Sequence, residues 1–136
     1  MVDMKNLVQR AAEFHGHLGP YLVLGLRAGL TATNMLGYAP LESNAEVETH
    51  LATPQSCFID GVQFSSGCTL GKMNIKIREA ATLSAVTFHR GGRRIRVKVK
   101  DKVLERLQRT PSQEMEKLAL TLAEEPDDQL FDIETK

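Results

Sequence analysis

The chain has 136 residues, of which 42% are hydrophobic, and its 17 basic and 17 acidic side chains cancel to a formal net charge of zero. This length predicts one domain with a single core, and the balanced charge argues against a general attraction to nucleic acid or to an anionic membrane. No apolar stretch is long enough to span a bilayer, and the N-terminal residues lack the apolar core of a signal peptide. We therefore expect a cytoplasmic protein.

Two helices separated by a loop are predicted in the first part of the chain. Apolar residues recur with a helical period from Val2 to Phe14, behind Asp3 as the N-cap. The next residues, HGHLGP at 15–20, contain two glycines and a proline and predict a loop. Pro20 then opens a helix from Tyr21 to Leu36 that is apolar around most of its circumference.

This second helix is the reason to expect a homodimer. A helix so apolar should be central or lie in a subunit contact, and Gly25 and Gly29 allow another backbone to approach it closely. Arg27 is its one charged residue, and we expect it to pair with a carboxylate. The candidate partners are Glu13, Asp60 and Glu79.

The remaining elements define the fold class. Period-two alternation predicts strands at 45–53, 75–78, 82–89 and 93–100, the last two joined by the turn Arg90-Gly91-Gly92. Helical periods predict helices at 101–109 and 112–125, and the tail after Pro126 can form a short strand or a docked arm. The expected fold is α+β, with helices packed on an antiparallel β-sheet in a single domain of residues 1–136, of which 126–136 form the docked tail.

One predicted strand carries a row of basic residues, namely Arg94, Arg96, Lys98 and Lys100. Such a row could contact nucleic acid, but it is also the ordinary way to keep a half-exposed strand soluble. No aromatic residues for stacking bases are interleaved with it. We therefore expect no nucleic-acid partner.

Both cysteines lie in one stretch, TPQSCFIDGVQFSSGCTLGKMN at 53–74. Thr53 as N-cap and Pro54 at the first helical position predict a helix whose first turn contains Cys57. A helix N-terminus lowers the pKa of a thiol, so the thiolate needed for nucleophilic or metal chemistry becomes accessible there. Asp60 lies one turn further on the same face. The alternative is that Cys57 and Cys68 are small buried hydrophobic residues; a disulfide is disfavoured, because nothing else indicates secretion.

The loop at 15–20 adds two imidazoles. His15 and His17 flank Gly16, which lets the backbone turn tightly enough for both rings to approach one ion. A pair of histidines in a turn is also common without any metal. His50 is a further ligand candidate at the end of its strand, although a solvent-facing histidine is the better interpretation.

The blocks FHGHLGPYLVLGLRAG at 14–29 and SCFIDGVQFSSGCTLGKMN at 56–74 together resemble the FmdE family, which takes its name from formylmethanofuran dehydrogenase. That family shows phenylalanine and His-Gly-His before a proline-initiated helix, then Cys-x-x-Asp leading into Gly-Cys-Thr-x-Gly-Lys. The resemblance implies a metal-binding α+β domain, usually dimeric. It assigns His15, His17, Cys57 and Cys68 to the metal, and Asp60, Thr69 and Lys72 to polar positions of the same pocket.

The chain departs from the family at two places. Many members have a cysteine at the position of Gly19, and many carry a C-terminal four-cysteine zinc ribbon, whereas no cysteine follows Cys68 here. The chain therefore resembles a stand-alone form without the ribbon.

These observations predict one divalent transition metal. Zinc is favoured because mixed imidazole and thiolate ligands suit it, with nickel or iron as alternatives. One hypothesis is an enzyme of one-carbon metabolism that acts on a formyl group or CO2. In this enzyme Asp60 or Lys72 would transfer protons, and Thr69 would contact the bound cofactor or an unidentified small molecule. Alternatively, the protein is a non-catalytic accessory or metal-carrier domain for a molybdenum- or tungsten-dependent dehydrogenase complex.

Overall fold

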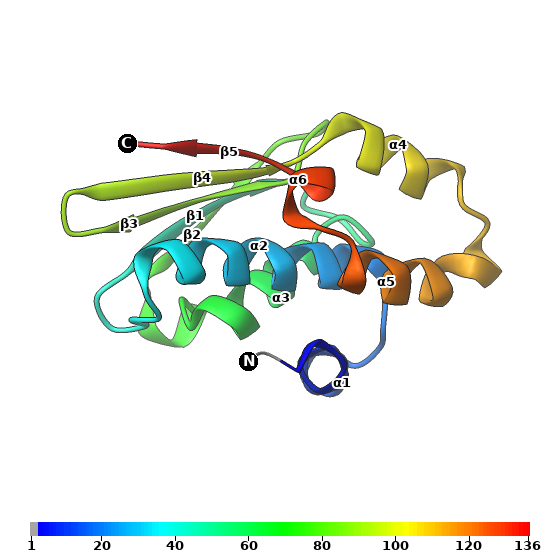
Figure 1. Ribbon diagram of the computed structural model, residues 1–136, viewed down its shortest axis with the longest axis horizontal. Coiled ribbons are helices and arrows are strands. Elements are labelled where there is room, and N and C mark those ends of the chain that lie inside the picture. Colours follow the sequence, from blue (N-terminus) through cyan, green and yellow to red (C-terminus); the bar gives the residue numbers. More distant parts are fainter. Residues whose placement is uncertain (1–2) are drawn as a thin grey trace.

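The sheet is the frame on which the helices are arranged. In the computed structural model, which describes residues 3–136, five strands pair in the order β2-β1-β3-β4-β5. Figure 1 shows the long helix α2 lying along the sheet, with α1 crossing below it. The strands are β1 (Asn44–Thr49), β2 (Ile75–Glu79), β3 (Ala85–Arg90), β4 (Arg93–Val99) and β5 (Phe131–Thr135).

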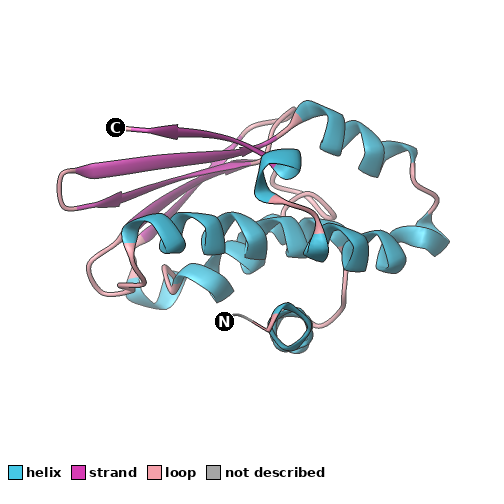
Figure 2. Cartoon of the chain, in the orientation of Figure 1, coloured by secondary structure: helices cyan, strands magenta, loops and turns pink. Residues whose placement is uncertain are grey.

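The helices in the described part of the chain confirm the α+β class, and Figure 2 shows them gathered mainly beside and beneath the strands. They are α1 (Met4–His15), α2 (Pro20–Leu36), α3 (Cys57–Ser66), α4 (Asp101–Arg109), α5 (Met115–Glu124) and α6 (Asp127–Leu130), with short 3-10 turns η1 (Leu70–Lys72) and η2 (Ser112–Glu114). None of these helices is both long and apolar enough to cross a membrane.

The sheet is mixed and not purely antiparallel as expected. The β3–β4 hairpin is antiparallel, as are the β1–β3 and β4–β5 pairs. β1 and β2, however, run parallel. The chain leaves β1, passes through α3, and returns to start β2 at the same end; a helical crossover of this kind joins parallel strands.

Period-two alternation sorts the strand residues between two faces. Val47, Val86 and Val97 lie on the inner face and are completely buried, whereas most outward residues of the same strands are charged. The helices cover only the inner face, so the outer face carries the charges. This is the ordinary pattern of a sheet with one solvated side.

Helix α2 occupies the centre of the core, and its glycines serve a contact within the chain. A Cβ at Gly25 would lie 2.0 Å from the Phe58 carbonyl oxygen, and one at Gly61 would lie 2.2 Å from the Leu22 carbonyl oxygen. The backbones of α2 and α3 therefore touch at glycine positions on both helices. Because the apolar surface of α2 is used inside the chain, it no longer argues for a dimer.

Local signals set most helix ends. Asp3 caps α1, since its Oδ1 accepts a hydrogen bond of 3.2 Å from the Asn6 N–H, and Gly16 ends α1 in a left-handed conformation with φ of 108°. The predicted first residue of α1, Val2, lies outside the described residues. The predicted start of α3 was wrong: residues 51–56 form bends and a turn, Ser56 occupies the N-cap position, and the helix begins at Cys57.

The C-terminal segment docks on both the sheet and α2. β5 pairs with β4, and Asp127, at the start of α6, binds Arg27 through an Nη2–Oδ1 contact of 2.7 Å. Arg27 does pair with a carboxylate, but the three candidates proposed from the sequence were wrong. Its partner is 100 residues away in the chain.

Candidate functional site

The predicted site residues lie at opposite ends of α3. Cys57 is the first residue of this helix, and Cys68 follows its C-cap, Gly67. Ten helical residues extend about 15 Å, whereas two thiolates on one zinc ion have their sulfurs only about 4 Å apart. The single pocket expected from the sequence is therefore two separate regions. His15, His17 and Asp60 lie at the Cys57 end, while Thr69 and Lys72 lie beyond Cys68.

The closest polar contact at the Cys57 end joins α1 to α3. His15 Nδ1 lies 2.5 Å from Asp60 Oδ2, with side-chain exposures of 11% and 38%. Asp60 Oδ1 also accepts a hydrogen bond of 3.4 Å from Gln63 Nε2. When Nδ1–H donates to the carboxylate, the ring keeps its lone pair on Nε2, and the carboxylate fixes its orientation.

His17 approaches His15 across the turn at Gly16. The two ring centroids are 5.0 Å apart, and the left-handed Gly16 makes this approach possible. A Cβ at Gly19 would lie 3.1 Å from His17 Nε2. The position at which many family members have cysteine is therefore next to the His17 ring, and glycine leaves that space open here.

The Cys57 thiol does not have the lowered pKa expected at a helix start. Burial raises its pKa, the negative charge of Asp60 raises it further, and a hydrogen bond from the backbone of Cys57 opposes both effects. The thiol is half-buried beside an anion, and these two influences outweigh the favourable position at the helix N-terminus. A bound cation would reverse the balance, because it attracts the thiolate.

Cys68 is completely buried in the hydrophobic core. Its backbone N–H donates a hydrogen bond of 3.1 Å to Ser66 Oγ. Burial raises the pKa of its thiol, while the Ser66 hydroxyl and the charge of Lys72 lower it by less. These surroundings are those of a small core residue, the alternative that the sequence left open.

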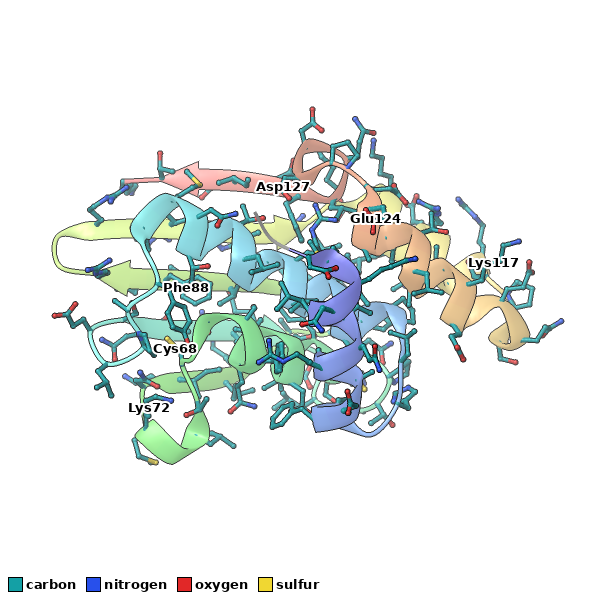
Figure 3. All side chains as sticks on the ribbon, turned by 60° about the horizontal axis from the view of Figure 1, so that its bottom comes forward. Cys68, Lys72, Phe88, Lys117, Glu124 and Asp127 are labelled. Atoms are coloured by element: carbon teal, nitrogen blue, oxygen red, sulfur yellow. The ribbon has the colours of Figure 1, made fainter. Side chains whose placement is uncertain are left out.

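The polar residues after Cys68 interact with each other. Thr69 Oγ1 accepts a hydrogen bond of 3.1 Å from Lys72 Nζ, and Figure 3 shows Lys72 on the turn beyond Cys68. This places both residues away from Cys57. His50, with its side chain 43% exposed, pairs with Glu79 at 3.2 Å.

Arg10, Phe14 and Phe64 lie together where α1 packs against α3, and the sequence did not assign them to the site. Phe14 is 59% exposed and its ring centroid lies 6.2 Å from that of Phe64, while the Arg10 guanidinium lies 5.6 Å from the Phe64 centroid. The sequence does show Phe64 one helical turn beyond Asp60 on the same face, and Phe14 directly before His15, but not that the two rings meet. We call Arg10, Phe14 and Phe64 the aromatic ledge.

The donor set at the Cys57 end suits a borderline-soft cation. Two imidazoles and one thiol are the ligand types that zinc, nickel and iron accept, and Asp60 supplies the carboxylate that commonly supports a ligating histidine. Within residues 3–136, no three His, Cys, Asp or Glu side chains are already arranged tightly enough to hold an ion. Binding of an ion here would therefore require side chains to rearrange.

Two comparisons relate the chain to known proteins. The model of a family described as "FmdE, Molybdenum formylmethanofuran dehydrogenase operon" matches residues 14–133. A protein of Archaeoglobus fulgidus, described as a probable S-adenosyl-L-methionine-binding protein, is 38% identical over 74 residues, which are 53% of this chain and 20% of that protein. The matched part thus spans about a fifth of the length of this relative.

Proposed function

The chain belongs to the FmdE family, and from this premise we propose that it binds one divalent transition metal ion at the start of α3. The observation that carries the proposal is the contact of His15 with Asp60, 2.5 Å long. The His17 ring centroid lies 5.0 Å from that of His15, and Cys57 is close enough to Asp60 for the carboxylate charge to raise the pKa of its thiol. Histidines that bind metals almost always donate their other ring N–H to a carboxylate, a carbonyl or water, and Asp60 offers such a carboxylate to His15.

His15, His17 and Cys57 would be the ligands. Three protein ligands are the usual number in catalytic zinc sites, whose remaining position takes water or substrate. Zinc is favoured, with nickel or iron as alternatives. A bound ion of this kind lowers the pKa of water or polarises a carbonyl group.

Asp60 would orient His15 and accept a proton through it, which refines the proton-handling role expected from the sequence. Cys68, Thr69 and Lys72 would have no part at this site, because the length of α3 separates them from it. Their roles are structural: Cys68 fills the core, and Thr69 and Lys72 close the η1 turn.

Two classes of activity fit such a site. In the first, the protein acts on or supports one-carbon metabolism at the formyl or CO2 level, which the operon in the family's description favours. In the second, it is a non-catalytic accessory or metal-carrier domain for a molybdenum- or tungsten-dependent dehydrogenase complex. The aromatic ledge favours the first, because the exposed Phe14 ring, one residue before His15, offers a stacking surface for a small planar molecule. The relative described as binding S-adenosyl-L-methionine, which carries an adenine ring, makes that compound the first ligand to test.

The test is metal content after incubation with zinc or cobalt(II) and removal of the excess. Wild-type protein should retain about one ion per chain, and its cobalt form should show thiolate-to-metal charge-transfer absorption. Cys57→Ser and His17→Ala should lose both signals, whereas Cys68→Ser, the matched control, should keep them. Full metal retention in Cys57→Ser, or equal loss in Cys68→Ser, would overturn the proposal.

A further inference from the structure

A small cavity lies at the end of the sheet where β1 and β2 finish. Its walls come from the start of α2, the residue after β1, the turn before α3, the β2–β3 turn and α4, and Figure 1 shows α4 and the start of α2 at the same end of the molecule. The free volume inside is about 30 Å³, which is room for about two water-sized groups. None of His15, His17 and Cys57 lines this cavity, so it is separate from the proposed metal site.

Tyr21 lines the cavity and has a hydroxyl that the described part of the chain does not use. The residue is 6% exposed, yet its hydroxyl has no hydrogen-bond partner in residues 3–136. Among the non-exposed residues that the structure describes, no completely buried side-chain nitrogen or oxygen lacks a partner, so this hydroxyl must meet accessible space, which the cavity provides. Burial raises the pKa of Tyr21, so the phenol keeps its proton and offers it to a ligand.

His50 lines the same cavity with one of its ring nitrogens already in use. Its Nδ1 lies 3.2 Å from both carboxylate oxygens of Glu79, and Glu79 Oε1 also accepts a hydrogen bond of 3.0 Å from the Leu51 N–H. The hydrogen bond from Leu51, and after it the one from His50, lowers the pKa of Glu79, so the carboxylate is charged and accepts a bond from Nδ1–H. The Nε2 of His50 then keeps its lone pair and can accept a hydrogen bond from a ligand.

The charges around the cavity argue for a neutral ligand. Apart from His50, no described residue that lines the cavity is acidic or basic. A carboxylate bound there would meet no lysine or arginine and would lie close to the charged Glu79 beside His50. A neutral group that accepts one hydrogen bond and donates another instead matches the Tyr21 donor and the His50 acceptor. An amide carries one of each on the same planar carbon.

We propose that this cavity binds a neutral amide group of a small molecule. The amide oxygen accepts a hydrogen bond from the Tyr21 hydroxyl, and the amide N–H donates one to His50 Nε2. The planar amide is about the size of two water molecules and so fits the free volume. The rest of the ligand reaches solvent at the mouth of the cavity, where Thr82 and Gln108 are exposed. This site goes beyond the proposed metal function and needs no metal.

An NMR titration of isotope-labelled, metal-free protein with acetamide and with acetate tests the proposal. Acetamide should bind with a Kd of roughly a few millimolar, because a ligand with so few non-hydrogen atoms has little surface to bind. Acetate has nearly the same size and shape and should bind at least about tenfold more weakly, because the Glu79 charge opposes it. Glu79→Gln removes that charge and should narrow the difference between the two ligands.

Two tyrosine variants make a matched pair. Tyr21→Phe should weaken acetamide binding about fivefold, because one hydrogen bond to the ligand is lost, and His50→Phe, which removes the acceptor, should have an effect of the same size. Tyr38→Phe makes the same chemical change at a residue that is 66% exposed and lies between α2 and β1, outside the cavity, and should leave the affinity unchanged.

The melting temperature separates a binding role from a structural one. Tyr21→Phe should melt at the wild-type temperature, since its hydroxyl has no partner within the chain to lose. A marked fall would show that the hydroxyl is bonded inside the protein and would overturn the proposal. Failure of acetamide to bind, equal affinities for acetamide and acetate, or an unchanged acetamide affinity in Tyr21→Phe would each overturn it as well.

Discussion

Replacing Arg27 by methionine should lower the free energy of unfolding by about 2–4 kcal/mol. The Arg27 side chain is 8% exposed, and its Nη2 lies 2.7 Å from Asp127 Oδ1. Its Nη1 donates hydrogen bonds of 2.9 Å to the Leu122 and Ala123 carbonyl oxygens. Those carbonyls end α5, where a positive charge is favourable. Arg27 therefore joins the central helix to the end of α5 and to the start of α6.

The magnitude follows from what the substitution leaves behind. Breaking a fully buried ion pair costs about 3–5 kcal/mol, but the Asp127 side chain is 44% exposed and can be rehydrated. The two carbonyl oxygens lose a charged donor, at about 1–3 kcal/mol when they remain without one. Methionine refills much of the aliphatic volume, which brings the expected total to about 2–4 kcal/mol.

Urea unfolding or thermal melting measures this change. For a chain of this size the melting temperature should fall by about 6–15 °C. Asp127→Asn should cost less, about 1 kcal/mol, because Arg27 keeps both carbonyl acceptors. Lys117→Met, at an exposed position on α5, should stay within about 0.5 kcal/mol of wild type. An Arg27→Met variant that also stays within that range would refute the anchoring role of Arg27, as would a larger loss of stability in Asp127→Asn.

Three further predictions concern the α2–α3 contact and the two thiols. Gly25→Ala should destabilise the fold by about 2 kcal/mol or more in a melting assay, since its Cβ would lie 2.0 Å from a carbonyl oxygen of α3. Gly92→Ala is the control and should be nearly neutral, because no atom outside its two chain neighbours lies within 4 Å of the added Cβ. Asp60→Asn should speed the alkylation of Cys57 by iodoacetamide near pH 7. The Asp60 charge raises the pKa of that thiol, so removing the charge increases the thiolate fraction. An unchanged alkylation rate would contradict this cause. A thiol reagent should modify Cys57 in the folded protein. Cys68 is completely buried and should react only when the protein unfolds. Equal reaction rates for the two thiols would show that the core around Cys68 opens.

Local patterns in the sequence predicted most of the elements. The apolar run behind Pro20 and before Gly37 predicted α2 with its observed end at Leu36, and the two glycines after Arg90 predicted the β3–β4 hairpin. Asp3 was predicted as a cap and is one. These features depend on residues a few positions apart, so the sequence contains all the information they need.

The candidate site was predicted only in part. The histidines and Asp60 were named from their residue types and motif, but their contact depends on how α1 packs against α3. The sequence predicted a lowered pKa for the Cys57 thiol, but the pKa is raised. The position of Cys57 at the helix start can be read from the sequence, whereas its burial beside the Asp60 carboxylate cannot. Cys68 was grouped with Cys57 because the two are close in sequence, although a straight helix holds them apart.

Local patterns along the chain thus specify most of the elements, the α+β class and the residue types available for metal chemistry. Long-range packing selects the parallel pairing of β1 with β2, the use of the α2 glycines inside the chain, and Asp127 as the partner of Arg27. The two groups of features differ in the range of the interactions behind them. Capping and periodicity act within a few residues, whereas sheet pairing, close helix packing and ion pairs join residues whose separation in the chain carries no local signal.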